Sequence, residues 1–397
     1  MTALPATELR ARAACLTVGF DGEAWILGRP DLGVFVAVPE PGAVFVTTLQ
    51  ETGSVAEATA RASEMAGEHV DGDEFVAGLT AAGLFEAAAE PDAPGRIRWI
   101  EGVGPEAAAR LFGRAGWTCY AAAAMTALAI LATRPDLRPS WNDAWFLPSP
   151  GLSLLAVLLL TIACTALHEA WHWLAGRAIG IPAIFRLSYR GVYVVFETDL
   201  TQIVTVPRNR RHGVYLAGMA IDAVVLAIVL GLRLLEPPGV LDGLLAATAL
   251  LQLSRIIWQW AALPLRSDSY ALLANALRCH NLYRTTWLTA KARLLGLTAK
   301  ETAELDAASA RDRRVATWFA VPYLAGIAVM AWLFVTVALP LAMSLGRWAW
   351  GQLGSAGIGS FGFWEAVVVV AFTGAELLLP VVLAVRERRL RRTGRLL

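Results

Sequence analysis

The sequence predicts an α-helical membrane protein that carries a small soluble domain at its N-terminal end. Hydrophobic residues make up 56% of the 397-residue chain and charged residues only 17%, whereas soluble domains average about 45–50% and about 25%. The stretch up to residue 98 has frequent charges and no apolar run near the ~20 residues that cross a bilayer. We therefore predict a soluble domain over 1–98 and a membrane domain over 99–397.

The soluble domain is expected to have an α+β, winged-helix-like fold. The first helix is predicted from Ser54 and Glu57, which have the spacing of a capping box, and the second is expected to end at Gly83. The expected elements are strands over 24–27 and 34–38 with a turn at 28–31 between them, then helices over 54–66 and 73–82.

The membrane domain is expected to cross the bilayer about six times. The apolar segments lie at 116–133, 151–175, 213–235, 240–263, 315–343 and 362–385. Arg and Lys gather before the first segment, between the second and third, between the fourth and fifth, and in the C-terminal tail. Because positive residues mark cytoplasmic loops, we predict a multi-pass protein of the cell membrane with both termini in the cytoplasm.

Charge and cysteine content exclude two other classes. Lys and Arg number 34 against 33 Asp and Glu, so no global positive field favours a nucleic acid as partner. The four cysteines are scattered and form no C-x-x-C pair, which argues against both a disulfide framework and a cysteine zinc site.

The second apolar segment contains an H-E-x-x-H motif formed by His168, Glu169 and His172. On a helix the two histidines lie one turn apart on one face, where both can bind one zinc ion. Glu169 is the expected catalytic base, which takes a proton from the attacking water and passes it to the leaving amine. The alternative is a polar cluster that holds helices together by hydrogen bonds.

A catalytic zinc ion needs a third protein ligand, and two aspartates are candidates. Asp268 follows the fourth segment at its cytoplasmic end, at a depth similar to that of the histidines. Asp222, in the third segment, lies roughly 15 Å inward from Arg211, near mid-membrane. Asp268 is the expected ligand and Asp222 the alternative, with Asp222 otherwise a structural hydrogen-bond partner.

Further polar residues of the apolar segments have weaker predicted roles. Arg255 is expected to neutralise Asp222 or Glu376, and Gln259 to orient a substrate backbone, although helix packing explains both equally well. Glu365 is expected to face water at the outer end of the sixth segment.

Residues 185–196 alternate between apolar and polar side chains around Arg190 and Gly191, which predicts a β-hairpin next to the membrane. Tyr193 on this hairpin is a candidate substrate contact. An exposed hairpin edge can take an extended peptide by strand addition; alternatively the hairpin only covers the site.

The membrane domain, over about 116–385, resembles the site-2 protease group of intramembrane zinc metalloproteases. The matching features are the H-E-x-x-H motif within a span, the β-rich loop after it, an Ala217-Gly218 pair in the third segment and Ser267-Asp268-Ser269-Tyr270 after the fourth. The resemblance implies that Asp268 is the third zinc ligand. Met219 and Ser269 stand where the group has Pro and Gly.

The soluble domain resembles, over about 15–90, PqqD-type modules that bind the leader peptides of ribosomally made, modified peptides. The resemblance rests on the strand pair, the helix from Ser54 and the second helix that ends at Ala81-Ala82-Gly83-Leu84. It implies capture of a leader peptide and no catalytic residue in this domain.

Together these features predict a zinc metalloendopeptidase that cleaves a precursor peptide or a membrane-anchored protein, in peptide maturation or export. Three alternatives remain: a non-proteolytic export or immunity component with a structural metal, a protease acting on an anti-sigma factor, and a transporter. The transporter is disfavoured because no inverted repeat is evident.

Overall fold

The computed structural model describes residues 6–21, 24–29, 32, 34–85, 96–97, 103–181, 184–190 and 193–392. The chain forms two compact units, and segments near residues 180 and 205 belong to the first. Unit 1 comprises Met1–Pro105, Gly176–Ile184 and Asp199–His212, and unit 2 comprises Glu106–Ala175, Phe185–Thr198 and Gly213–Leu397.

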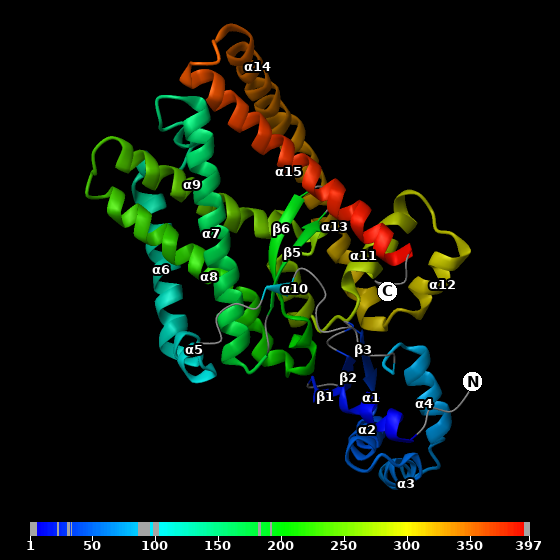
Figure 1. The fold of residues 1–397 in the computed structure, drawn as a ribbon. Coiled ribbons are helices and arrows are strands. Elements are labelled where there is room, and N and C mark those ends of the chain that lie inside the picture. The colour runs from blue at the N-terminus through cyan, green and yellow to red at the C-terminus, as the bar shows by residue number, and fades with distance from the viewer. Residues whose placement is uncertain are drawn as a thin grey trace. The chain divides into compact units, whose positions relative to one another are not determined.

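Unit 1 begins with a helical and β-stranded domain, drawn in blue in Figure 1. Its elements are α1 (Ala6–Ala14), β1 (Thr17–Phe20), β2 (Trp25–Arg29), β3 (Val34–Val38), α2 (Glu40–Thr52), α3 (Val55–Ala66), α4 (Gly72–Ala81) and the short β4 (Arg96–Ile97). The first three strands form an antiparallel sheet in the order β1-β2-β3, in which Leu27 pairs with Val18 and Val36. Phe45, Leu49 and Phe85 are fully buried in its core.

Local sequence explains where α3 and α4 begin and end. The Ser54 side chain accepts a hydrogen bond from the Glu57 N–H at 3.2 Å, and Asp71 caps α4 in the same way. Gly83 follows α4 with a φ of +82°, a conformation that glycine adopts without steric cost. Both predicted helices and both predicted strands are therefore present, but the prediction lacked α1, β1 and α2. The predicted turn at 28–31 is wrong in part, because Gly28 and Arg29 belong to β2; residues 30 and 31 lie outside the described residues.

Most of unit 2 is helical. Its helices are α5 (Pro105–Leu111), α6 (Arg114–Thr133), α7 (Pro150–Ala178), α8 (Arg208–Arg233), α9 (Val240–Ala261), α10 (Asp268–Ala276), α11 (Leu282–Leu294), α12 (Ala299–Ala307), α13 (Ala310–Leu333), α14 (Leu339–Ser355) and α15 (Phe361–Arg392), of which α5, α7 and α8 extend into unit 1. Short 3₁₀ helices are η1 (Pro135–Leu137), η2 (Trp141–Ala144), η3 (Thr201–Thr205, unit 1) and η4 (Leu263–Leu265), and a π-helical turn is η5 (Phe334–Ala338). Strands β5 (Ile184–Arg190) and β6 (Tyr193–Asp199) are neighbours in one sheet, where the hairpin was expected.

Among the residues that the structure describes, five helical stretches are long and apolar enough to cross a membrane: Arg114–Thr133, Pro150–Ala178, Arg208–Arg233, Val240–Ala261 and Ala310–Ser355. They correspond to the first five predicted segments, and their length and composition are typical of a membrane protein. The sixth predicted segment is helical in α15, of which Phe361–Ala375 is a shorter apolar helix.

The fifth apolar stretch is longer than expected. The prediction placed its end at 343, but helical structure continues through η5 into α14 and ends at Ser355. Pro340 cannot donate a hydrogen bond to the preceding turn, and the π-helical turn just before it accommodates this without breaking the helix. In Figure 1, α15 runs beside α14, and the two helices pack together.

Two apolar clusters connect the helices of unit 2. One joins α6, α8 and α9 through Ile130, Leu226, Leu230 and Ala249. The other joins three elements, η4, α11 and α13, and includes Leu263, Leu282 and Phe319. These clusters fix α8, α9 and the connection after α9, which all contribute to the site described next.

Candidate metal centre

Helix α7 presents His168 and His172 on one face, as the four-residue spacing requires. Both are nearly inaccessible, with 3% and 5% of their surface exposed. Their Nε2 atoms lie 3.2 Å apart. The histidine pair is therefore buried within unit 2 and directed to one point.

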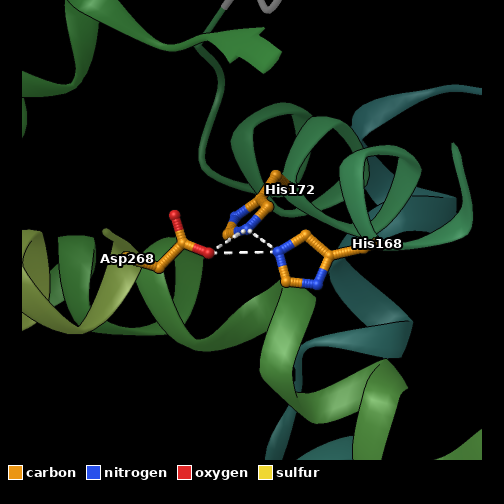
Figure 2. A group of neighbouring side chains, drawn as sticks. All are labelled: His168, His172 and Asp268. Carbon is orange, nitrogen blue, oxygen red and sulfur yellow. Dashed lines mark hydrogen bonds and ion pairs between the residues drawn. The ribbon is translucent and has the colours of Figure 1, made fainter. Parts of the chain in front are cut away.

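Asp268 reaches the same point from the first residue of α10 (Figure 2). Its Oδ2 atom lies 3.1 Å from Nε2 of each histidine. The chain turns sharply just before it, because Arg266 has a φ of +57° at the end of η4 and Ser267 then caps α10. Within the described part of the chain, these three side chains form a group that could hold a metal ion.

The outer ring nitrogens of both histidines have partners that only accept hydrogen bonds. His168 Nδ1 lies 2.7 Å from the Asp222 carboxylate, and His172 Nδ1 lies 2.8 Å from the Val214 carbonyl oxygen. Each Nδ1 therefore carries a proton, so that in a neutral imidazole Nε2 carries the free electron pair. The free electron pairs of the two Nε2 atoms and a carboxylate oxygen meet at one point, which is an arrangement that a cation stabilises.

The spacing of the three atoms also fits a metal. A tetrahedral ion with bonds of about 2.0–2.1 Å sets its ligand atoms about 3.3 Å apart. A hydrogen-bonded cluster without a metal would carry a proton on only one of the two Nε2 atoms, because two protonated Nε2 atoms 3.2 Å apart repel each other. The residues present therefore fit a metal with two imidazole ligands, one carboxylate ligand and a further open position.

Helix α8 passes close to this point because residue 218 is glycine. A Cβ atom built at Gly218 would overlap the imidazole rings of both His168 and His172. Ser269 and Met219, the two positions that depart from the site-2 protease pattern, contact each other with Oγ to Sδ at 3.6 Å. Met219 and Ser269 thus pack against each other beside the candidate ligand Asp268.

Gln259, near the end of α9, binds Asp268 through both polar atoms of its side-chain amide. Gln259 Nε2 donates to Asp268 Oδ2 at 3.0 Å, and Oε1 accepts from the Asp268 N–H at 3.0 Å. Burial acts to raise the pKa of the Asp268 carboxyl, but the two histidines beside it, when protonated, lower that pKa below its usual range. The two hydrogen bonds from Gln259 therefore fix the orientation of a candidate metal ligand.

Glu169 does not join the three ligand atoms but is held by strand β6. Its Oε2 atom accepts hydrogen bonds from both the backbone N–H and the hydroxyl of Thr198, each at 2.8 Å. The same hydroxyl also lies 3.0 Å from the Glu169 backbone oxygen. Thr198 was not predicted, since 29 residues separate it from Glu169 and nothing in its local sequence suggests a polar role.

The other predicted residues are distributed as follows. Asp222 lies against the outer nitrogen of His168, and Arg255 lies 4.0 Å from Asp222. Gln259 is bound to Asp268, so its amide is occupied by the candidate ligand. Tyr193 begins β6, and its side chain, like that of Glu376, lies outside the described residues.

The expectation for Glu365 is wrong. Only 8% of its surface is exposed, and Oε1 accepts hydrogen bonds from the Leu152 N–H at 2.8 Å and from the Ser149 hydroxyl. The first N–H groups of a helix have no partner within the helix, and a carboxylate is favoured there. Glu365 therefore serves the N-terminus of α7 rather than water.

Comparison with known proteins gives no match to a family model, to a curated protein or to a solved structure. Functional conclusions therefore depend on the residues of this chain.

Proposed function

We infer that this protein is a membrane-embedded zinc metalloendopeptidase. The observation that carries the proposal is the convergence of His168 Nε2, His172 Nε2 and Asp268 Oδ2 within 3.2 Å of one another. The two histidines lie on an apolar helix that also bears Glu169. Ionisable groups are costly in a membrane helix and usually have a function there.

The three candidate ligands and Glu169 have separate roles in the proposed reaction. His168, His172 and Asp268 hold the ion, and two nitrogens with one oxygen are a common ligand set for catalytic zinc. When bound, zinc activates water and polarises a peptide carbonyl. Glu169 accepts the proton of the attacking water and returns it to the amine that leaves.

Substrate binding is assigned to the two β-structures. The β6 edge of the β5–β6 pair would receive an extended segment of a precursor peptide or a membrane-anchored protein, since strand addition needs only backbone groups. The N-terminal domain would bind a leader peptide and raise its concentration at the membrane. Maturation or export of a ribosomally made peptide is the process that both assignments favour.

The test measures zinc content and proteolysis with the full-length protein in detergent micelles. Fluorescein-labelled casein serves as the substrate probe. We expect one zinc ion per chain in the wild type, loss of zinc in His168→Ala, His172→Ala and Asp268→Ala, and retained zinc in Glu169→Gln. Casein cleavage in Glu169→Gln should fall by at least about 100-fold, as for loss of a catalytic base.

Glu106→Gln, at an exposed position on α5, is the matched control and should cleave as the wild type does. A wild type without zinc contradicts the proposal. Zinc-loaded wild type that does not cleave casein, or Glu169→Gln that cleaves it normally, instead supports a structural metal in a non-proteolytic membrane component.

A further inference from the structure

A second layer of polar residues lies on the side of His168 that faces away from Asp268. Asp222 Oδ2 is 2.7 Å from His168 Nδ1, and the Asp222 side chain is 1% exposed. Arg255 of α9 approaches the same Oδ2 atom with Nε at 4.0 Å and donates to the Thr165 hydroxyl at 2.9 Å. Helices α7, α8 and α9 each contribute one of these three residues.

The two histidines are supported unequally. His172 donates to a neutral carbonyl oxygen, that of Val214, whereas His168 donates to a carboxylate. A carboxylate partner makes an imidazole a stronger electron donor and fixes which ring nitrogen is free to bind a metal. The effect of Asp222 should therefore appear at Nε2 of His168.

The position of Asp222 carries a cost that packing does not explain. It lies in α8 at a point where the helix is apolar, and its Oδ1 atom has no hydrogen-bond partner among the described residues. An apolar side chain would avoid this cost, because a buried ion pair usually stabilises no more than apolar residues of similar volume. Arg255 lowers the cost by placing a positive charge beside the carboxylate, and Thr165, three residues before His168, fixes that arginine.

We propose that Asp222 is a positioning residue for His168 and that Arg255 supplies its counter-charge, so that the pair sets the metal affinity of the site. This inference rests on the proposed metal site. It assigns Asp222 to the support of a ligand rather than to the ligands themselves, because Asp222 contacts the ring nitrogen that points away from the cluster.

The test is a measurement of metal affinity, which needs no substrate. Zn²⁺ and Co²⁺ dissociation constants are determined for the full-length protein by competition with a chelator, and the Co²⁺ absorption spectrum reports the ligand field. Asp222→Asn keeps a hydrogen-bond acceptor but removes the charge, and Asp222→Ala removes both. We expect affinity to fall about 10-fold in the first and up to about 100-fold in the second, with a shifted Co²⁺ spectrum.

Arg255→Gln tests the counter-charge and should alter metal affinity less than Asp222→Ala does. The matched control is Asp242→Asn, which breaks the Arg233–Asp242 ion pair between α8 and α9 away from the site. This control should leave affinity and spectrum unchanged.

The possible results separate this inference from the metal site itself. If the wild type binds no metal, the proposed function fails. If His168→Ala abolishes binding while Asp222→Asn binds metal with wild-type affinity and spectrum, the metal site stands and the role of Asp222 is refuted. A merely structural role predicts lower thermal stability with unchanged affinity. Should Asp222→Ala fail to fold, Asp222→Asn alone decides.

Discussion

Thr198 is the residue that connects Glu169 to the β5–β6 pair. Both of its donors reach the same carboxylate oxygen, Oε2, at 2.8 Å. The second oxygen, Oε1, is thereby given a defined direction. A base that must receive a proton at one position benefits from this restriction, since misplacement of a catalytic group slows reactions strongly.

Replacement of Thr198 by valine removes the hydroxyl donor and keeps the backbone N–H. We expect casein cleavage at saturating substrate to fall about tenfold, which corresponds to loss of one hydrogen bond to a charged group. Zinc content should not change, because the hydrogen bonds of Thr198 to described residues go to Glu169 and not to a candidate ligand. Thr198→Ser retains the hydroxyl and should restore most of the activity; equal losses in Val and Ser would contradict this role.

At the residue scale, the four-residue spacing predicted which side chains share one face of α7. The expected depth in the membrane predicted which aspartate lies beside them. His168, Glu169 and His172 follow from helical periodicity, and Asp268 from its place just after an apolar segment. The partners of these residues could not be predicted in the same way, since Val214, Thr198 and Gln259 reach the site through tertiary packing. Glu365 was misjudged because it lies 213 residues from Leu152 in the sequence but only 2.8 Å from the Leu152 N–H in the structure.

Among the elements, the end of β1 lies beside a buried ion pair within unit 1. Asp21 follows β1 and is 2% exposed, with Arg208 Nε at 3.3 Å and an Arg211 guanidinium nitrogen at 3.7 Å. The Arg208 N–H also donates to the Asp21 carbonyl oxygen at 3.0 Å. The first turn of α8 is thus attached to the N-terminal sheet.

Asp21→Ala should loosen this attachment. The change removes the carboxylate beside Arg208 and Arg211, which are 9% and 6% exposed, and breaking a buried ion pair costs roughly 3–5 kcal/mol. We expect faster hydrogen exchange in 17–29 and 201–208, measured by mass spectrometry. Glu57→Ala, which breaks the exposed Glu57–Arg61 pair, is the control and should change little. Equal protection in Asp21→Ala and wild type would show that the pair contributes nothing to this attachment.

Element boundaries were predictable wherever a cap was visible in the sequence. Ser54 and Gly83 mark helix ends by chemistry that acts within a few residues. Helix α2 was missed because Pro41 and Gly42 resemble a turn, whereas Pro is also compatible with the first turn of a helix. Its buried face, which includes Phe45, Val46 and Leu49, is recognisable once the start is placed before Pro41.

For the whole molecule, the distribution of charge constrains the topology more than the length of the apolar segments does. The stretch Ala310–Ser355 has 46 residues, more than twice the ~20 that span a bilayer. Length alone therefore does not define which of these residues lie within the membrane. The basic groups at 311–314 and 386–395, however, lie in the first turn of α13 and after the apolar part of α15. If both lie in the cytoplasm, α13–α14 crosses outward and α15 returns, and the connection at 356–360 lies outside.

This topology can be tested with single cysteines in a variant that lacks the native four. Cysteines at Asn142 and Gly357 should react with a membrane-impermeant maleimide in intact cells, because both positions are assigned to outer connections. Cysteines at position 15, where the native Cys15 is exposed, and at Ala307 should react only after the membrane is permeabilised. Labelling of Asn142→Cys without Gly357→Cys would contradict this topology, because residue 357 would then lie on the cytoplasmic side and α13–α14 would not cross the membrane.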